Sequence, residues 1–356
     1  MRAALALARR GLGSTWPNPA VGCVLVRDGR VVGRGTTAPG GRPHAEAVAL
    51  AMAGGAARGA TAYVTLEPCS HHGQTPPCAD ALISAGVVRV VVAGDDPDPR
   101  VNGNGLARLR AAGLDLATGV MSAEADEQQA GFLSRVRTGR PLVTLKLATT
   151  LDGRIATGAG ESRWITGPEA RRAGHALRGQ HDAVLVGIGT VLADDPDLTC
   201  RIPGFRKTPL VRIVVDSTLR TPLSARVAAT AQETPTWILR GDAAEAGRVA
   251  ALEAAGVRLL ATDGVRVDLA AALHLLGKAG LTRVMAEGGA GIAAALLRAG
   301  LVDRVAWFHA PAIMGGDGLA GVQPFGVAGL DGMPRFVRTA TRPMGDDMLT
   351  ELRRAA

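Results

Sequence analysis

Aromatic residues are scarce in this chain of 356 residues, of which Phe, Trp and Tyr make up 3 %. Surfaces that bind single-stranded nucleic acid stack the bases on aromatic rings, so this scarcity argues against such a surface. Lysine occurs only three times, and the arginines behind the formal net charge of +8 are scattered rather than gathered in a basic run. We therefore expect the positively charged side chains to bind small phosphorylated molecules and not nucleic acid.

The chain also lacks a long apolar run and a secretory signal. No stretch approaches the length of a membrane-spanning helix, and the apolar, basic start MRAALALARR is not followed by a cleavage site. Four cysteines do not suggest a disulfide framework, and two of them are better explained by a metal. These absences predict a cytoplasmic protein in a reducing compartment, without membrane contact.

A hydrophobic content of 47 % and a charged content of 20 % are typical of a globular protein, and 356 residues exceed one ordinary domain. Segments typical of strands alternate with segments typical of helices in both halves, which predicts the α/β fold class. The stretch Thr138-Gly139-Arg140-Pro141 interrupts this pattern. We place the boundary there, with one domain over 1–139 and a second over 140–356.

The stretch from Arg42 to Cys78 carries the clearest chemical signal. His44, Cys69 and Cys78 offer one imidazole and two thiolates, a ligand set that suits Zn²⁺ and leaves a fourth position open for water. Glu46 follows the histidine by two residues and is free to move protons. The zinc deaminases combine H-x-E with P-C-x-x-C, and here Pro68-Cys69 matches while the second cysteine is delayed to Cys78.

The elements predicted around these residues suit a metal site. The apolar run 63–66 predicts a buried strand that ends just before Glu67-Pro68, and Pro43 precedes a helix over about 45–52. A second helix is predicted to begin near Cys78, after two prolines. The positive end of a helix lowers the pKa of a thiol, so we expect this position to favour the thiolate.

Two other interpretations of this stretch stay open. His71 or His72 would complete a four-ligand zinc site with a purely structural role, since structural zinc normally has four protein ligands. Alternatively, the cysteines are unrelated to any metal. The order of His-x-Glu, Pro-Cys and a second cysteine favours the catalytic interpretation.

The second half predicts another α/β domain. We expect strands over 142–150, 182–190, 209–218, 283–289 and 304–311, and helices near 242–255, 268–279 and 290–299. The stretch 286–300 passes from a strand through a glycine loop into an apolar helix, whose first N–H groups are suited to phosphate. The same pattern also fits a plain strand–helix connection. VGIGT at 186–190 likewise suggests either a cofactor loop or a turn.

Taken together, these motifs resemble one family. HAE followed by TLEPCSHHGQTPPC, with eight residues between the cysteines, resembles the bifunctional riboflavin-biosynthesis deaminase–reductases. The second half resembles their reductase domain through LKLATTLDGR, GESRWITGPEAR, GTVLADDPDLTCR, VDS and EGGAGIAAALL. The likeness spans essentially the whole chain. It implies a cytidine-deaminase-like α/β/α sandwich followed by a dihydrofolate-reductase-like α/β domain.

The resemblance implies two consecutive reactions on one phosphoribosylated pyrimidine. In the first, 2,5-diamino-6-(5-phosphoribosylamino)pyrimidin-4(3H)-one loses its 2-amino group by hydrolysis and gives 5-amino-6-(5-phosphoribosylamino)uracil. In the second, NADPH reduces the ribosyl group and gives 5-amino-6-(5-phosphoribitylamino)uracil. The implied cofactors are one Zn²⁺ in the first domain and NADPH in the second.

Site residues follow from the resemblance position by position. It places the zinc on His44, Cys69 and Cys78 and makes Glu46 the proton carrier. Implied contacts with the cofactor fall on Ala148, Trp164, Thr190, Asp194, Ser217, Gly289, Ala290, Gly291, Ile292, Ala293, Ala294 and Ala295. Implied contacts with the substrate fall on Ser162, Arg178, Leu198, Arg201 and Glu287. The two arginines would bind the phosphate with forked donors, and Glu287 would bind sugar hydroxyls.

Lys146 and Asp194 are further candidates for orienting the substrate. His175, His181, His274 and His309 show no pairing signal and are expected to be structural. The chain begins at what would be the middle of the family's first helix, and Ala20 stands where some members have a larger or polar residue.

Three hypotheses follow. The first is the two-step enzyme, and the second is a nucleic-acid base deaminase whose second half is a binding module. The third keeps only one half active and makes the other an assembly domain. The cysteine spacing and the scattered charge favour the first. Whether the chain forms a homo-oligomer stays open.

Overall fold

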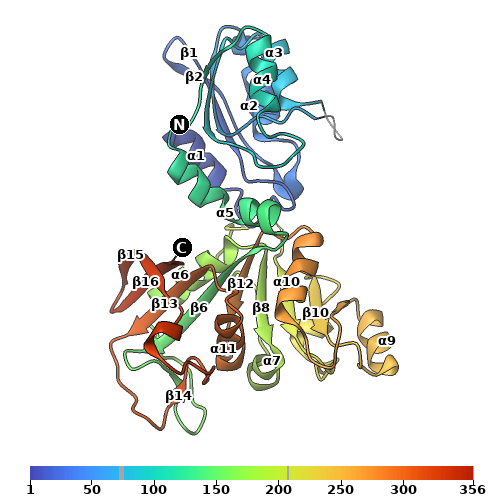
Figure 1. Cartoon of the computed structure of the whole chain (residues 1–356), viewed down its shortest axis with the longest axis vertical. Coiled ribbons are helices and arrows are strands. Elements are labelled where there is room, and N and C mark those ends of the chain that lie inside the picture. The colour runs from blue at the N-terminus through green and yellow to red at the C-terminus, as the bar shows by residue number, and fades with distance from the viewer. Residues whose placement is uncertain (72–75, 207, 356) are drawn as a thin grey trace. The chain divides into compact units, whose positions relative to one another are not determined.

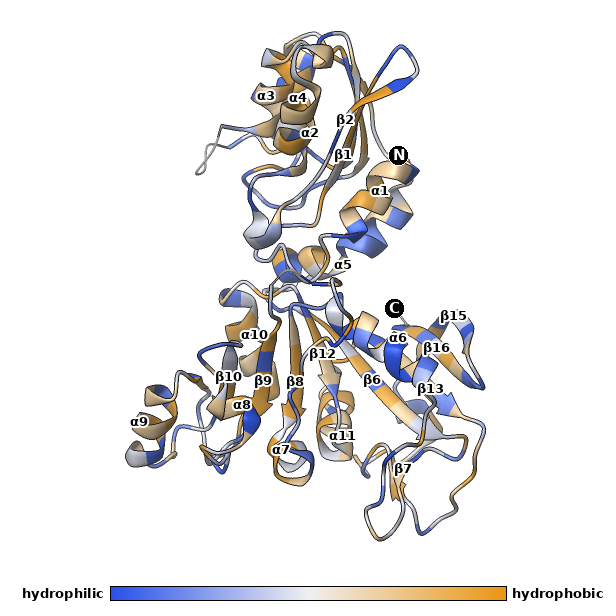
Figure 2. Cartoon of the chain, turned by 180° about the vertical axis from the view of Figure 1, so that it is seen from behind, coloured by the Kyte–Doolittle hydropathy of each residue, from blue (hydrophilic) through white to orange (hydrophobic). Residues whose placement is uncertain are grey.

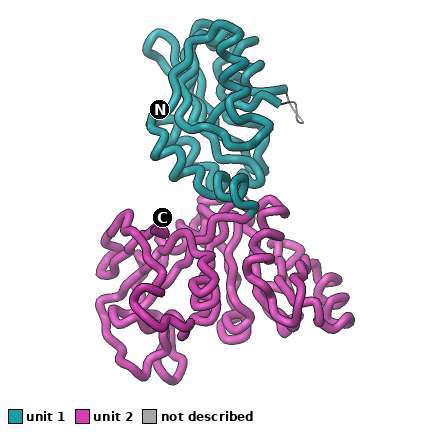
Figure 3. Tube along the Cα trace, viewed as in Figure 1, with its two compact units in different colours: residues 1–139 teal, residues 140–356 magenta. Residues whose placement is uncertain are grey.

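The computed structural model describes residues 1–71, 76–206 and 208–355. The chain divides into two compact units, Met1–Gly139 and Arg140–Ala356 (Figure 3). Each unit has its own sheet and its own hydrophobic core. Over the residues that the structure describes, no helix combines the length and the apolar character needed to cross a membrane.

The first unit is a five-stranded mixed sheet with the strand order β2-β1-β3-β4-β5 (Figure 1). Its strands are β1 (Gly22–Arg27), β2 (Arg30–Thr36), β3 (Thr61–Leu66), β4 (Arg89–Gly94) and β5 (Asp115–Ala117). Its helices are α1 (Arg2–Arg9), α2 (Ala45–Ala53), α3 (Cys78–Ser84), α4 (Asn104–Ala111) and α5 (Ser122–Thr138), with 3-10 turns η1 (Pro39–Gly41) and η2 (Gly54–Ala57). β1 pairs antiparallel with β2 and β3, whereas β3, β4 and β5 run parallel. The carboxyl ends of β3 and β4 therefore meet at one edge.

Glycines allow α2 to lie directly on the β1–β2 hairpin. A Cβ atom at Gly33 would lie 2.3 Å from the Ala49 carbonyl oxygen, and one at Gly35 would lie 2.2 Å from the Ala45 carbonyl oxygen. Real Cβ atoms do not approach a backbone oxygen so closely. The absence of these two side chains thus fixes the place of α2, which carries Glu46 in its first turn.

The second unit is built on a nine-stranded sheet with the order β11-β10-β9-β8-β12-β6-β13-β16-β15. Its strands are β6 (Leu142–Thr150), β7 (Arg154–Ala156), β8 (Ala183–Gly187), β9 (Val211–Val215), β10 (Thr236–Arg240), β11 (Arg258–Ala261), β12 (Arg283–Glu287), β13 (Arg304–Ala310), β14 (Leu319–Ala320), β15 (Phe336–Met344) and β16 (Asp347–Arg354). Its helices are α6 (Pro168–Gly179), α7 (Ile188–Asp194), α8 (Arg226–Ala229), α9 (Ala246–Ala254), α10 (Leu269–Lys278) and α11 (Ala290–Arg298), with the 3-10 turn η3 (Leu330–Gly332). β7 and β14 form a separate two-stranded sheet.

In the order just given, all strands from β11 through β6 to β13 run parallel. β16 then pairs antiparallel with β13, and β15 pairs antiparallel with β16. Hydrophobic residues dominate the central strands β6 and β8 (Figure 2). β12 lies between β8 and β6, so the strand order reverses there and the chain has a topological switch point. In open α/β sheets, ligands bind outside the carboxyl ends of the strands at such a point.

Helices cover both faces of the nine-stranded sheet. On one face, Val184, Val214 and Ile238 of three adjacent strands pack with Leu252 of α9 in one core cluster. On the opposite face, α11 lies against β8, where a Cβ atom at Gly187 would lie 2.8 Å from Ile292 Cγ1. The missing side chain at position 187 lets α11 begin beside the end of β8.

Most predicted elements are confirmed within a few residues, and the strand 142–150 matches β6. The predicted strand 182–190 is wrong at its end, because β8 stops at Gly187 and α7 begins at Ile188. A short apolar run does not by itself distinguish a buried strand from a buried helix. The hairpin of β15 and β16 was not predicted, since β15 is largely exposed and alternates only weakly between apolar and polar residues.

Substituting Gly35 with alanine tests the contact between α2 and the hairpin. The added methyl group would force α2 away from β2, and we expect the first unit to lose about 1 to 3 kcal/mol of stability. The measurement is urea unfolding of the Gly35→Ala variant against the parent protein. Gly55→Ala is the matched control, because a Cβ atom there meets nothing within 4 Å. Equal losses in both variants would contradict this packing role of Gly35.

Candidate functional site

Three elements of the first unit bring the predicted metal ligands together. His44 is the residue before the first turn of α2, Cys69 follows the carboxyl end of β3, and Cys78 is the first residue of α3. Their ligand atoms all lie within 4.8 Å of one another. His44 Nδ1 lies 3.4 Å from Cys78 Sγ and 3.7 Å from Cys69 Sγ.

The donor chemistry of this group fits a zinc ion. Two sulfur atoms and one imidazole nitrogen form a soft ligand set with three members, as catalytic zinc sites have. His71 does not belong to the group, although its Nδ1 is buried and has no hydrogen-bond partner among the described residues. His72 lies outside the described residues. A four-ligand structural site through His71 is therefore not supported.

The two thiols interact with each other and do not titrate alike. Hydrogen bonds from Cys78, and a further one with His44, outweigh burial and lower the pKa of Cys69 to about 4. The pKa of Cys78 is raised by its hydrogen bond to Cys69 and by burial. Of the two thiols, Cys69 is therefore the one that holds the negative charge.

Glu46 is buried in the first turn of α2, with 3 % of its surface exposed. Burial and the charge of Cys69 raise the pKa of Glu46 to about 7, against a hydrogen bond with Cys78 that acts in the opposite direction. A carboxyl group with a pKa near neutrality accepts and releases a proton with similar ease. The position and the chemistry of Glu46 thus suit a proton carrier beside the three ligands.

Two buried carboxyl groups near this edge of the sheet were not singled out from the sequence. Glu67 accepts hydrogen bonds from the backbone N–H groups of Gly103, Gly105 and Leu106 at the start of α4. It therefore holds α4 against the metal loop. Asp96 follows β4, and burial raises its pKa to about 6. The proline-rich polar loop after the predicted strand was the available signal for Asp96.

In the second unit, Glu287 lies at the carboxyl end of β12 and forms ion pairs with two positively charged side chains. Lys146 Nζ on β6 lies 3.2 Å from Glu287 Oε1, and Arg178 on α6 donates to Oε2 through Nε at 3.0 Å and Nη2 at 2.6 Å. Burial alone would raise the pKa of Glu287, but the two cations lower it to about 2. The carboxylate is therefore charged at every physiological pH.

Arg178 has hydrogen-bond partners within the protein on all three of its nitrogens. Its Nε and Nη2 donate to Glu287 and its Nη1 donates to the Thr199 carbonyl oxygen at 2.6 Å. The forked donors of Arg178 are thus directed at protein groups and not at a phosphate. Arg201 is exposed, and its two terminal nitrogens have no partner among the described residues.

The glycine loop before α11 fits a phosphate-bearing cofactor. Gly288 and Gly289 have positive φ angles of 88° and 80°, which favour glycine over any residue with a side chain. A Cβ atom at these positions would lie 3.3 and 3.4 Å from Thr190 Oγ1. The predicted segment Gly289–Ala295 thus forms the start of α11, exposed at Gly289 and Gly291, with Thr190 of α7 beside it. Its first N–H groups are suited to a phosphate.

The other predicted residues lie on several elements of the second unit. Ala148 lies on β6 and packs against a small core cluster. Ser162 and Trp164 are exposed in the loop before α6. The guanidinium carbon of Arg171 lies 4.5 Å from the centre of the Trp164 ring. Asp194 pairs with Arg163 at 3.6 Å. Ser217 follows β9, and its Oγ accepts from the Val267 N–H. Leu198 is buried with a φ angle of 53°.

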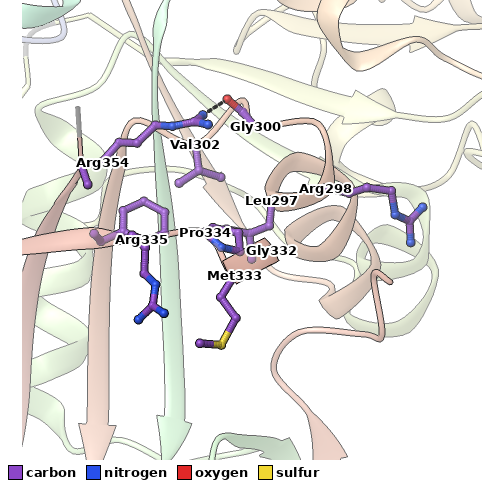
Figure 4. A pocket seen from close by; sticks show the side chains of 11 residues that line it. Leu297, Arg298, Gly300, Val302, Gly332, Met333, Pro334, Arg335 and Arg354 are labelled. Atoms are coloured by element: carbon purple, nitrogen blue, oxygen red, sulfur yellow. Dashed lines mark hydrogen bonds between the residues drawn. The ribbon is translucent and has the colours of Figure 1, made fainter. Parts of the chain in front are cut away.

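Two pockets of the second unit are not lined by any predicted site residue. One of about 370 Å³ is bordered by Arg298, Arg335 and Arg354 (Figure 4), and an apolar one of about 460 Å³ lies next to it. Each of the three arginines donates to backbone carbonyl groups, for example Arg354 to that of Gly300. Arg298 of α11 thus holds residues 324–325, Arg335 bonds within the segment before β15, and Arg354 joins β16 to Gly300, which follows α11.

His175 and His181 belong to the four histidines that are expected to be structural. Both have hydrogen-bond partners near the site or in its sheet. His181 is buried and hydrogen-bonds to the Leu177 carbonyl oxygen and to Thr144 Oγ1, in agreement with a structural role. His175 contacts Arg201, a partner for which the sequence shows no signal. The sequence places these partners 26 positions apart, which is why no local pattern revealed the contact.

Comparison with known families and proteins identifies close relatives. The cytidine and deoxycytidylate deaminase zinc-binding region matches residues 1–94, and the RibD C-terminal domain matches residues 141–349. The riboflavin biosynthesis protein RibD of Escherichia coli strain K12 is 45 % identical over 363 residues, which cover 99 % of this chain and 98 % of that protein. The protein of the same name from Aquifex aeolicus is 42 % identical over 354 residues, with 99 % and 97 % covered.

Solved structures agree with this likeness. Acinetobacter baumannii RibD, form 1, has a TM-score of 0.89 at 37 % identity and covers 100 % of this chain and 98 % of that chain. A diaminohydroxyphosphoribosylaminopyrimidine deaminase/5-amino-6-(5-phosphoribosylamino)uracil reductase from Thermotoga maritima has a TM-score of 0.87 at 34 % identity, with 100 % and 97 % covered. The predicted fold class, two α/β domains of deaminase and reductase type, is confirmed.

The lowered pKa of Glu287 predicts a dependence of stability on pH. Because the folded-state pKa lies below the ordinary value, the charge stabilises the second unit fully above about pH 4.5, and the effect is lost as the pH falls toward 2. We expect Glu287→Gln to cost up to about 3 kcal/mol at pH 7 and progressively less below pH 4.5.

Urea unfolding followed by tryptophan fluorescence measures this effect, since Trp164, Trp237 and Trp307 lie in the second unit. The control is Glu253→Gln, which removes an exposed carboxylate on α9. A loss in Glu287→Gln that is the same at pH 7 and pH 3 would show that charge is not the cause.

Proposed function

The chain belongs to the family of bifunctional riboflavin-biosynthesis deaminase–reductases, and from this premise we propose that each of its units holds one of the two sites. It is an enzyme with a zinc-binding deaminase part and an NADPH-dependent reductase part. We assign the deaminase to residues 1–139 and the reductase to 140–356. The observation that carries the assignment is the group of His44, Cys69 and Cys78 with buried Glu46 beside it.

In the first unit, His44, Cys69 and Cys78 hold the zinc ion. A bound zinc ion lowers the pKa of a water molecule to about 7 and so supplies hydroxide at neutral pH. Glu46 takes a proton in the hydrolytic step and passes it to the departing amino group, so that water is consumed and ammonia leaves. Its raised pKa supports this role, because the same group must accept and then donate one proton.

In the second unit, the start of α11 binds the phosphates of the cofactor. NADPH supplies the hydride that reduces the ribosyl group. The segment 289–295, through the free N–H groups at the start of α11, binds and orients the cofactor together with Thr190 and Ser217. Ala148, Trp164 and Asp194 also contact it. The positive φ angles of the two glycines before α11 and their contact with Thr190 support this arrangement.

The substrate of the second unit lies beside Glu287. Lys146 and Arg178 keep Glu287 ionised, so its carboxylate accepts hydrogen bonds from hydroxyl groups of the sugar. Arg201 binds the phosphate through its two terminal nitrogens. Leu198 and Ser162 complete the contacts with the substrate.

The class of substrate is a small phosphoribosylated pyrimidine. The full assignment is deamination of 2,5-diamino-6-(5-phosphoribosylamino)pyrimidin-4(3H)-one, followed by NADPH reduction of 5-amino-6-(5-phosphoribosylamino)uracil to the ribitylamino compound. The likeness to the Thermotoga maritima deaminase and reductase, 34 % identical over the whole of this chain, supports this assignment. We also propose a cytoplasmic location, in line with four cysteines that form no disulfide.

Nucleic acid is not part of the proposal. A base deaminase acting on nucleic acid would need a basic, aromatic-bearing surface, and its affinity would fall steeply with salt. The low aromatic content and the dispersed arginines argue against such a surface. Binding of a labelled oligonucleotide at low salt, lost at high salt, would favour that alternative.

Replacing Glu46 with glutamine separates the two activities. The amide keeps the size of the side chain but cannot take a proton, so we expect ammonia release to fall about 100- to 10,000-fold. Reduction of supplied 5-amino-6-(5-phosphoribosylamino)uracil by NADPH should continue at the rate of the parent protein. Zinc content, measured by atomic emission, should stay at one ion per chain.

The control for this variant is Glu124→Gln, which changes an exposed carboxylate on α5. Both activities should survive it. Loss of both activities in a folded Glu46→Gln protein would contradict the assignment of two independent sites. Full ammonia release in that variant would show that Glu46 is not the proton carrier.

A further inference from the structure

Residues 199–201 are fastened to α6 at three consecutive positions. Arg178 Nη1 donates to the Thr199 carbonyl oxygen at 2.6 Å, and Cys200 Sγ donates to the His175 carbonyl oxygen at 3.2 Å. Arg201 Nε then donates to His175 Nε2 at 3.1 Å. The loop that carries Arg201 therefore takes its course from two side chains one turn apart on α6.

The contact between His175 and Arg201 constrains the guanidinium group. A guanidinium carries five N–H donors in a rigid plane, of which one is on Nε and four are on the terminal nitrogens. Accepting the Nε–H fixes the orientation of the plane and leaves the opposite edge, with Nη1 and Nη2, unoccupied. That edge is able to bind a phosphate through two parallel hydrogen bonds.

The imidazole of His175 is suited to this task by its tautomer. It also hydrogen-bonds to the Thr199 backbone. Nε2 lies 3.1 Å from Arg201 Nε, and Nδ1 lies 3.4 Å from the Arg201 backbone N. A guanidinium only donates, so Nε2 is the acceptor nitrogen of the neutral ring. The proton is then on Nδ1, and the longer contact with the backbone N–H is not a hydrogen bond in this tautomer. Burial and the nearby charges of Arg178 and Arg201 lower the pKa of His175, which keeps the ring neutral.

We propose that His175 is a positioning residue of the reductase site: it holds the Nε–H of Arg201 and so presents the terminal nitrogens of that arginine to the phosphate of the substrate. The proposal rests on the function proposed above for Arg201. In this proposal His175 acts through Arg201, so its effect is on binding of the phosphorylated substrate and not on hydride transfer.

The test measures steady-state reduction of 5-amino-6-(5-phosphoribosylamino)uracil and of its dephosphorylated form with saturating NADPH. We expect His175→Leu to raise the KM of the phosphorylated substrate about tenfold, the factor that corresponds to the loss of one hydrogen bond to a charged group. The kcat and the KM of the dephosphorylated substrate should stay within about twofold, since neither depends on that bond.

Three further variants sharpen the experiment. His175→Gln retains an acceptor for the Nε–H and should restore most of the lost affinity. Arg201→Leu should raise the KM of the phosphorylated substrate, and the double variant with His175→Leu should be no worse than Arg201→Leu alone. His274→Leu is the matched control, because His274 is exposed on α10.

The outcomes separate the two proposals. If Arg201→Leu raises the KM and His175→Leu does not, the positioning role is wrong and the function of Arg201 stands. If Arg201→Leu has no effect on the phosphorylated substrate, the proposed contact of Arg201 fails, and the role of His175 with it. Equal losses for both substrates in His175→Leu, or no rescue by glutamine, would assign His175 a purely structural role. His175→Ala serves the same comparison if the leucine variant does not fold.

Discussion

Parallel strands bring polar side chains to one edge of a sheet, and both candidate sites lie at such an edge. In the first unit, β3 ends just before Glu67 and Cys69, and β4 ends before Asp96. In the second unit, Glu287 ends β12 beside Lys146 of β6. Helices α2, α3, α7 and α11 begin at these edges, so each site also receives the N–H groups of a helix start. The chemistry of both units depends on this one geometric constraint.

The two buried carboxyl groups show how the surroundings decide what a glutamate does. Glu46 has a thiolate nearby, so burial and like charge raise its pKa to about 7. Glu287 has Lys146 and Arg178 at hydrogen-bond distance, and these cations lower its pKa to about 2 in spite of burial. The first group is able to carry a proton at neutral pH, whereas the second is a fixed charge that accepts hydrogen bonds. In the proposed function, one residue type thus serves hydrolysis in one unit and substrate binding in the other.

Local sequence patterns predicted the metal ligands and most strands, because residue type, spacing and apolar runs are local properties. The same patterns did not reveal where Arg178 points, since its partner Glu287 lies 109 residues away. They also did not reveal that α7 begins at Ile188, because an apolar run is compatible with either a strand or a helix. His175 was expected to be structural, although its partner Arg201 lies on a loop that only the tertiary structure brings to α6. Contacts between distant segments are what the sequence leaves undetermined.

A coupled assay on the intact protein tests the central claim most directly. The diaminopyrimidine ribotide and NADPH are supplied together, and ammonia release and loss of nicotinamide absorbance are followed with and without a zinc chelator. We expect both signals in the untreated protein and neither after chelation, while pre-deaminated intermediate is still reduced in the presence of the chelator. Ammonia release without any consumption of NADPH, or reduction of the pre-deaminated intermediate that stops on chelation, would contradict two independent sites on this chain.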